Sequence, residues 1–478
     1  MIIMTKKASL IILILLSIGV HFAFFGHPNE TVFDEVHFGK FVSAYYTHEY
    51  YFDIHPPGGK LIIAGFAKIF NFSPEYSFAQ IGQAFPDNKY LFLRFLPVLA
   101  GTLLPIIIFL LACQLGLRRN ASFLAGLLII LENALLTQSR YILLDPFLLL
   151  FGFTALFFYF KYRPPSRVSS GLIPNSYFLI PMAIFSGLAV SIKWTGLSFL
   201  AIAGIIEFIH VIKCHAPTIR YWLFAIGKLF IFFFVIPLVV YFSIFIAHFS
   251  LLTKSGDGDA FMTPAFQNSL QGSDYANDLQ LKPLNTFQKF IELNQEMYTA
   301  NQTLTATHPY GSKWYTWPFM IRSIYYWNNA NMTNGHTERI YLLGNPFIWY
   351  LSTIAVFYLL ISSLFDFVST KYKTKKFIFP DSSFLILLGG FAINLLPFVG
   401  IGRVMFLYHY LTAYIFAILM LAYWVDKFKP HSEKKNLMIV LGLALIAGIF
   451  FVYFAPLSYG LDITQDSFTN RLWLLSWQ

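Results

Sequence analysis

The chain has 478 residues, of which 57% are hydrophobic and only 12% are charged. Ordinary soluble domains carry about 25% charged residues, and the mean hydropathy is +0.61. These values exclude a soluble globular enzyme and a disordered protein. Each membrane-spanning helix needs about 20 apolar residues, so the length allows several spans as well as long loops. The composition therefore predicts an all-α polytopic membrane protein.

Apolar segments recur along the whole chain, and the sequence predicts about eleven spans. They cover residues 8–26, 91–115, 121–138, 141–160, 177–192, 195–212, 221–250, 345–366, 382–400, 404–425 and 436–456. Basic pairs such as Lys6-Lys7, Arg118-Arg119 and Lys434-Lys435 lie in short loops on one side. Because cytoplasmic loops carry an excess of Lys and Arg, this side is expected to be inside. The net charge of +10 then reflects membrane orientation rather than nucleic-acid binding.

Two long outer loops divide the chain. We expect an N-terminal transmembrane module at 1–250 with the first outer loop at 27–90, an outer cap at 251–344, and a C-terminal transmembrane module at 345–478. Within the first loop, apolar residues recur at helical spacing in 33–46 and 59–70, on either side of His55-Pro56-Pro57. Amphipathic helices of this kind lie in a membrane surface rather than across it.

Two adjacent carboxylates, Asp34 and Glu35, open the first of these surface helices. A structural interpretation is that Asp34 caps the helix and that Glu35 favours its dipole. A cap needs only one such residue, however, and the same loop contains Asp53, His55 and Lys60. The loop is therefore a candidate active site as well.

Four cations lie at the outer ends of expected spans, where the orientation does not require them. They are Arg94, Arg140, Lys193 and Arg403. Charges at membrane depth are costly and usually face a cavity, although a lone Lys193 is explained more simply by extension of its side chain to the interface. Together with Asp145, which follows Arg140, the four favour an anionic ligand such as a lipid phosphate.

Several sequence blocks resemble, in order, those of the protein O-mannosyltransferase (PMT) family. FDEVHFG at 33–39 and YFDIHPP at 51–57 resemble the family's first outer loop. Further similar blocks lie at 132–145, 191–197, 308–318, 344–346 and 403–410. The matches extend from about residue 30 to about residue 415, and the set is far more specific than any single block.

The resemblance implies a GT-C glycosyltransferase fold and inverting transfer of mannose from a polyprenyl-phosphate donor to Ser or Thr hydroxyls of proteins outside the cytoplasm. Asp34 matches the family's acidic catalytic position, and Glu35 accompanies it. Lys313 and Gly58-Gly59 depart from the family pattern. The loop at 251–344 is too short for the β-trefoil MIR domain of eukaryotic members. The resemblance thus implies a bacterial or archaeal type in a prokaryotic plasma membrane.

An inverting displacement needs one base, and the departing phosphate needs cations rather than an acid. We expect Asp34 to be the base, with Glu35 beside it. The expected contacts to the donor phosphate are Lys60, Arg94, Arg140 and Arg403. The expected substrate-binding residues are Asp53, His55, His308, Tyr310, Trp314, Tyr408 and His409. No metal or other cofactor is expected, because Asp257-Gly258-Asp259 is explained equally well as a turn.

The expected partners are polyprenyl-phosphate-mannose, secreted or membrane protein acceptors and membrane lipids, with no nucleic acid and with the oligomeric state left open. One alternative is a GT-C transferase that uses a lipid or glycan acceptor. A transporter or flippase predicts charged or broken spans near the middle of the membrane, whereas the charges here gather at one face. A non-catalytic membrane scaffold is the third alternative.

Overall fold

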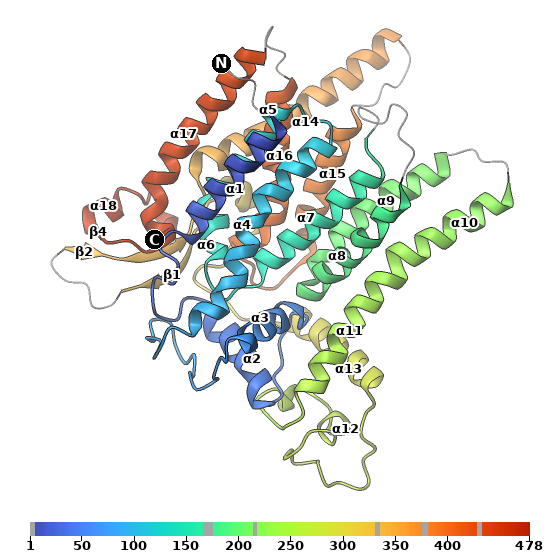
Figure 1. Cartoon of the computed structure of the whole chain (residues 1–478), viewed down its shortest axis with the longest axis vertical. Coiled ribbons are helices and arrows are strands. Elements are labelled where there is room, and N and C mark those ends of the chain that lie inside the picture. Colours follow the sequence, from blue (N-terminus) through green and yellow to red (C-terminus); the bar gives the residue numbers. More distant parts are fainter. Residues whose placement is uncertain (1–4, 166–174, 214–217, 330–334, 375–380, 428–432) are drawn as a thin grey trace.

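The computed structural model is a bundle of long helices that carries a smaller group of helices and loops at one end (Figure 1). It describes residues 5–165, 175–213, 218–329, 335–374, 381–427 and 433–478. The bundle consists of α1 (Lys6–Phe22), α4 (Tyr90–Gln114), α5 (Arg119–Ile130), α6 (Asn133–Ser139), α7 (Asp145–Tyr162), α8 (Leu179–Ile192), α9 (Leu197–Lys213), α10 (Ile219–Phe230), α11 (Ile236–Leu251), α14 (Pro346–Thr374), α15 (Ser382–Leu395), α16 (Leu411–Lys427) and α17 (Glu433–Tyr459).

Every expected apolar segment overlaps at least one of these helices. Among the described residues, seven helices are long and apolar enough to cross a membrane, or up to eight if the pair α5 and α6, bent by 57°, counts as one span. The polytopic helical architecture is therefore confirmed. The number of about eleven spans stays a prediction, because helices such as α1, with 17 residues, and α8, with 14 residues, are shorter.

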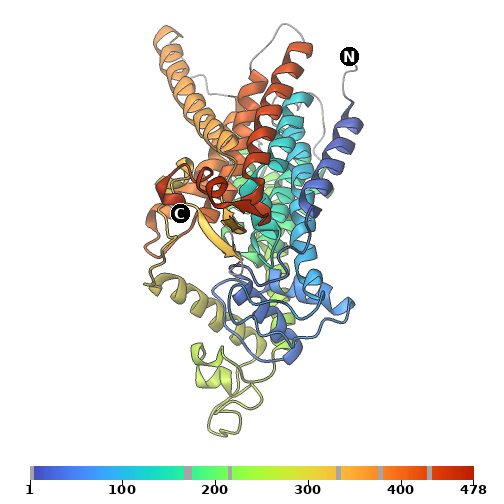
Figure 2. The ribbon, with the colours of Figure 1, turned by 90° about the vertical axis from the view of Figure 1, so that its left-hand side faces the viewer.

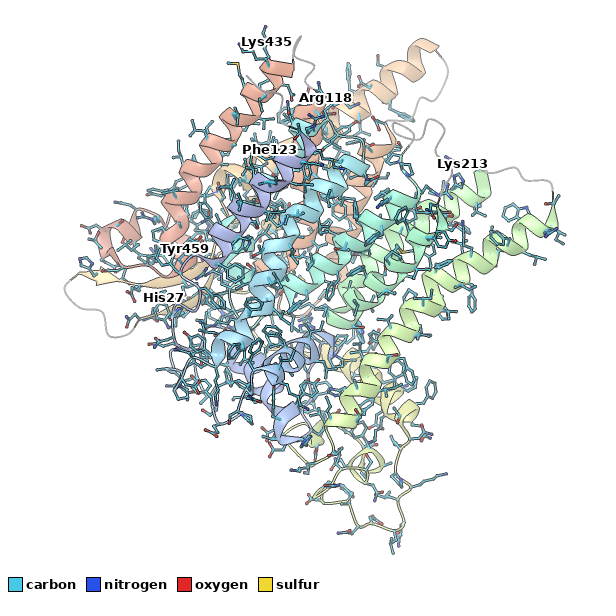
Figure 3. All side chains as sticks on the ribbon, viewed as in Figure 1. His27, Arg118, Phe123, Lys213, Lys435 and Tyr459 are labelled. Carbon is cyan, nitrogen blue, oxygen red and sulfur yellow. The ribbon has the colours of Figure 1, made fainter. Side chains whose placement is uncertain are left out.

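The surface helices of the first outer loop are α2 (Glu35–Thr47) and α3 (Gly58–Ile69), as the periodicity predicted. They lie at one end of the bundle together with α12 (Pro264–Gln267) and α13 (Thr286–Thr303) (Figures 1 and 2). Arg118, Lys213 and Lys435 lie at the opposite end (Figure 3). The loops that carry these three basic residues thus lie away from the surface helices, and the orientation in the membrane stays a prediction.

Two small antiparallel sheets lie beside the bundle, and the sequence did not predict them. In one, β1 (Ile324–Asn328) pairs with β3 (Arg339–Leu342), with a bulge between Tyr325 and Trp327. In the other, β2 (His336–Thr337) pairs with β4 (Ile463–Thr464), just before α18 (Gln465–Thr469). The second sheet joins the outer loop to the C-terminal segment.

The centre of the bundle is α16, in which nearly every residue is buried. It packs against α5, α14 and α15. By contrast, α10 and α11 expose many apolar side chains, which is the pattern of helices that face lipid. The structure therefore has a protein core around α16 and a lipid-facing periphery.

Glu132 fixes the break between α5 and α6. Its carboxylate accepts hydrogen bonds from the Tyr414 hydroxyl at 2.6 Å and from the backbone N–H groups of Asn345 at 2.9 Å and Ala134 at 3.1 Å. A buried carboxylate is tolerated because all of these donors satisfy it. By fixing this break, Glu132 also positions α6 and the start of α7, which follows it in the chain.

Candidate functional site

A cavity of about 490 Å³ opens between the outer ends of the bundle helices and the loops above them. Its apolar lining comes from α7, α9, α15 and the turn after α15, and includes Leu148, Leu197, Ala201, Ile393 and Pro397. Its polar lining comes from helix ends and outer loops and includes His55, Asp145, Lys193, Asn301, Arg403, Tyr408 and His409. This combination suits a ligand that has a polar head and an apolar tail.

Lys193 and Asp145 form an ion pair in the wall of this cavity. The Lys193 ammonium lies 2.8 Å and 2.9 Å from the two carboxylate oxygens of Asp145. Lys193 is positioned at the turn between α8 and α9, and Asp145 is the first residue of α7. The ammonium also lies 5.2 Å from the centre of the Tyr408 ring, a cation–π distance.

Arg403 supplies the second positive charge of the cavity. It lies in the segment between α15 and α16 and lines the cavity beside Tyr408 and His409. Within the described part of the chain, Arg403 takes part in no ion pair. Its five N–H donors are therefore suited to bind an anion.

Asp34 directly precedes α2, yet its side chain makes no capping hydrogen bond. The capping interpretation is therefore not supported. The pKa of this carboxyl group is raised to about 7, mainly by burial; the charge of Lys193 opposes the shift, and the charges of Asp145 and Asp53 add to it. A carboxylate with a pKa near neutrality is suited to accept a proton.

Phe33 connects Asp34 to the cavity wall. Its ring stacks on Tyr326, with the ring centres 4.0 Å apart, and its φ of +46° turns the chain sharply before α2. The Tyr326 hydroxyl donates to the Gln138 side-chain carbonyl, and the Gln138 amide donates to Asp145 at 2.7 Å. A left-handed φ is costly for a bulky residue, so the stack and these hydrogen bonds hold Asp34 in its place.

Glu35, which was expected beside the base, does not line the cavity. It is fully buried, and its two oxygens accept from Arg94 at 2.7 Å and 2.6 Å. The backbone N–H groups of Val32 and Ile142 donate to the same carboxylate at 2.8 Å and 2.9 Å. Glu35 therefore joins the start of α2 to the segment between α6 and α7, and its expected catalytic role stays a prediction.

Arg94 and Arg140 do not line the cavity, in contrast to the prediction. The remaining Arg94 donors bind the backbone carbonyls of Gly26, Pro28 and Glu30. Arg140 donates to the carbonyls of Ala23 at 2.7 Å and Phe24 at 2.6 Å, and its guanidinium lies 4.6 Å from the centre of the Tyr459 ring. Both arginines thus bind the backbone of the turn that follows α1. Figure 3 labels His27, which lies in this turn, and Tyr459, which lies near it.

Lys60, an expected phosphate contact, does not line the cavity. Its ammonium pairs with Asp53 and donates to the His55 carbonyl at 2.9 Å, while Asp53 accepts from the His55 backbone N–H at 3.2 Å. Lys60 and Asp53 together hold the turn that brings His55 to the cavity. Burial, with the charges of Lys193, Lys60 and Arg403, lowers the pKa of His55 well below its usual value, so His55 is neutral.

Of the other expected substrate-binding residues, Tyr408 and His409 line the cavity, whereas His308, Tyr310 and Trp314 do not. The His308 ring lies 5.1 Å from Phe406, and the Ser312 N–H donates to the Met405 carbonyl at 2.8 Å. The loop that carries these residues therefore supports the segment between Arg403 and Tyr408 from outside.

Lys193 and Asp145 were noted in the sequence among the charges that favour an anionic ligand but were not expected as site residues, and Asn301 was not expected in the cavity. A signal existed, because Lys193 and Asp145 both lie in blocks that resemble the PMT family. Asn301 carried no signal as a cavity residue, since it comes from the end of α13 and reaches the cavity only through the packing of the outer cap.

No group of three His, Cys, Asp or Glu side chains suited to a metal occurs in the residues that the structure describes. Asp259 accepts hydrogen bonds from the Ser255 hydroxyl at 2.6 Å and from the Gly256 N–H at 3.2 Å. These bonds form a turn. The expectation that no metal takes part stays a prediction.

Comparisons with known proteins support one family. A family model described as dolichyl-phosphate-mannose-protein mannosyltransferase matches residues 11–253, and a second, described as the C-terminal four TMM region of protein-O-mannosyltransferase, matches residues 286–477. Dolichyl-phosphate-mannose–protein mannosyltransferase 1 of Candida albicans is 23% identical over 95% of this chain and 76% of its own length. Protein O-mannosyltransferase 1 of Drosophila melanogaster is 35% identical over 54% of this chain and 30% of its own length.

A solved structure supports the same fold. A chain of the Saccharomyces cerevisiae protein O-mannosyltransferase Pmt1-Pmt2 complex, bound to the sugar donor, superposes with a TM-score of 0.89 at 21% identity. The match covers 100% of this chain and 93% of that chain. The predicted GT-C fold is thereby confirmed. The chain belongs to the dolichyl-phosphate-mannose-protein mannosyltransferase family.

Proposed function

We propose that the cavity binds the mannosyl donor and that Asp34 is the base of the transfer. The protein is a glycosyltransferase of its family, which moves mannose from a polyprenyl-phosphate donor to Ser or Thr hydroxyls of proteins. Lys193 and Arg403 face the donor phosphate. The polyprenyl chain follows the apolar lining from α9 and α15 towards the membrane.

The chemistry follows from this placement. The acceptor hydroxyl oxygen attacks the anomeric carbon of mannose from the side opposite the phosphate, and Asp34 takes the hydroxyl proton. The carbon–oxygen bond to the phosphate breaks at the same time, and the polyprenyl phosphate leaves with the bonding electron pair. The positive charges of Lys193 and Arg403 stabilise the charge that develops on it. The configuration at the anomeric carbon is inverted.

One observation carries this proposal: a buried carboxylate with a pKa of about 7 lies near a cavity whose lining has two cations, Lys193 and Arg403, and an apolar part. A glycosidase would need a second carboxyl group as acid. The donor phosphate is already a stable leaving group, so one base is sufficient.

The acceptors are proposed to be secreted or membrane proteins, since α2, α3 and α13 lie at the end opposite the basic loops. We propose that this end faces the outside of a prokaryotic plasma membrane. The solved relative is a Pmt1-Pmt2 complex, and the number of subunits of the present protein is left open.

The test is transfer by the purified protein in lipid nanodiscs. Polyprenyl-phosphate-mannose is incubated with a Ser/Thr peptide and, as the matched control, with the same peptide in which Ala replaces Ser and Thr. We expect mannosylated Ser/Thr peptide with inverted configuration and no product with the control. Transfer to a lipid or glycan acceptor alone would favour the alternative GT-C activity.

A further inference from the structure

The cavity lining is less positive than its two cations alone would make it, because a carboxylate lies beside one of them. Among the described residues, the charged lining consists of Asp145, Lys193 and Arg403. Lys193 is paired with both oxygens of Asp145, at 2.8 Å and 2.9 Å, whereas Arg403 has no carboxylate partner among the residues that the structure describes. The charge of Lys193 is therefore balanced, and the cavity lining carries one net positive charge.

Hydrogen bonds from residues other than Lys193 also hold the Asp145 side chain in place. One of its oxygens accepts from the Gln138 amide at 2.7 Å, and the Gln138 carbonyl accepts from the buried Tyr326 hydroxyl. The stack of Tyr326 on Phe33 completes this support. Asp145 therefore does not leave when an anion approaches Lys193. An ammonium has three N–H donors, so one of the three remains for the ligand.

The two phosphate ligands of the reaction differ in charge. The donor is a phosphodiester with one negative charge, and the product is a phosphomonoester whose second pKa is about 6. The leaving lipid therefore gains a second negative charge near neutral pH. A site with two unbalanced cations would hold this product more tightly than the donor and would remain occupied after each transfer.

We propose that Asp145 is a specificity-determining residue: by balancing Lys193 it matches the site to the singly charged phosphodiester and disfavours the doubly charged phosphomonoester. This inference rests on the proposed function, because it requires both phosphates to bind at Lys193 and Arg403. Asp145 thereby promotes release of the product lipid. It takes no part in bond making or breaking.

The test compares Asp145→Asn with its parent in the full-length protein in nanodiscs, both in an Asp34→Asn background so that Asp34 does not titrate. The probes are a short polyprenyl phosphate and its methyl phosphodiester, and binding is measured by calorimetry. At pH 8 we expect Asp145→Asn to tighten the monoester about 10- to 100-fold and the diester by a smaller factor, because the doubly charged ligand gains more from the unbalanced Lys193. At pH 5 both probes carry about one negative charge, so Asp145→Asn should change the affinities for the monoester and the diester by the same factor.

Asp462→Asn is the matched control, because it removes an exposed carboxylate outside the cavity, paired with His336. It should leave the ratio of the two affinities unchanged. If Asp145→Asn does not fold, the parent alone is decisive: its affinity for the monoester should not rise between pH 5 and pH 8.

Equal changes for both probes in Asp145→Asn, or a parent that binds the monoester more tightly as it gains charge, would overturn the inference and leave the proposed function intact. A parent that binds neither probe would overturn the inference together with the proposed donor class.

Discussion

Arg94 binds Glu35 through two parallel hydrogen bonds of 2.7 Å and 2.6 Å, and both side chains are fully buried. The same guanidinium holds the carbonyls of Gly26, Pro28 and Glu30. The segment between α1 and α2 therefore surrounds the Arg94 guanidinium and binds it through backbone carbonyls and Glu35. These contacts determine where α2 begins and where Asp34 lies.

The first prediction concerns this pair. Glu35→Gln should destabilise the protein by about 3–5 kcal/mol, because it leaves the buried Arg94 charge without its partner. The measurement is thermal unfolding in detergent. Asp462→Asn, which breaks the exposed pair with His336, should change the stability by about 0–1 kcal/mol. An unfolding temperature of Glu35→Gln equal to that of Asp462→Asn would contradict the structural role.

The second prediction separates two arginines that looked equivalent in the sequence. Arg403→Ala should weaken polyprenyl phosphate binding by about 1.5–3 kcal/mol, the value of a hydrogen bond to a charged group. Arg140→Ala should lower stability and leave the affinity of the folded fraction nearly unchanged, since Arg140 binds the carbonyls after α1. The two affinities are measured by calorimetry in nanodiscs. A larger loss of polyprenyl phosphate affinity in Arg140→Ala than in Arg403→Ala would place the phosphate near Arg140.

The third prediction concerns the turn that carries His55. Lys60→Met and Asp53→Asn should each reduce mannose transfer, because Lys60 binds the His55 carbonyl and Asp53 binds its N–H. The double variant should be no worse than the more severe single variant, with a coupling of about 0.5–3 kcal/mol. Additive losses in initial rate would show that the two side chains act independently.

The fourth prediction is a pH profile. The pKa of Asp34 is raised to about 7, so the carboxyl group is protonated, and cannot accept a proton, below that pH. We expect kcat/KM for the peptide to fall about tenfold per pH unit below pH 7, as for a single essential base. The donor phosphodiester does not titrate in this range. A rate that is constant down to pH 5 would exclude Asp34 as the titrating base.

The same shift predicts a stability effect with a definite sign. The pKa of Asp34 is higher in the folded protein than its ordinary value of 3.8, so folding disfavours the ionised form, and stability is lost as the pH rises from about 3.8 to about 7. Asp34→Asn stays neutral and should therefore unfold at a higher temperature than the parent at pH 8. At pH 4, close to the ordinary pKa of 3.8, the two proteins should differ little. A capping role would instead make the variant no more stable at either pH.

The architecture was accessible from the sequence because its signals are local. Apolar segments of span length and the helical spacing in 33–46 and 59–70 each depend on neighbouring residues alone, and the structure has helices there. The pairing of β2 with β4 joins residues more than a hundred positions apart. No local pattern indicates a two-residue strand of this kind.

The site was predictable only in part for the same reason. The cations at the outer ends of spans were correctly recognised as unusual, but the charge alone does not say what each one faces. Arg94 and Arg140 meet carbonyls and a carboxylate from distant loops, whereas Arg403 meets a cavity. Long-range packing decides between these outcomes. Lys193 was underrated because its partner, Asp145, lies 48 positions earlier.

The most direct test of Asp34 as the base is mannose transfer to a Ser/Thr peptide by Asp34→Asn at saturating donor, with donor binding measured on the same preparation. The amide keeps nearly the same shape but cannot take the hydroxyl proton. Turnover should fall about 10²–10⁴-fold, the usual contribution of a general base, while donor affinity and folding are retained. Near-parental turnover with intact donor binding would contradict the assignment of Asp34 as the catalytic base.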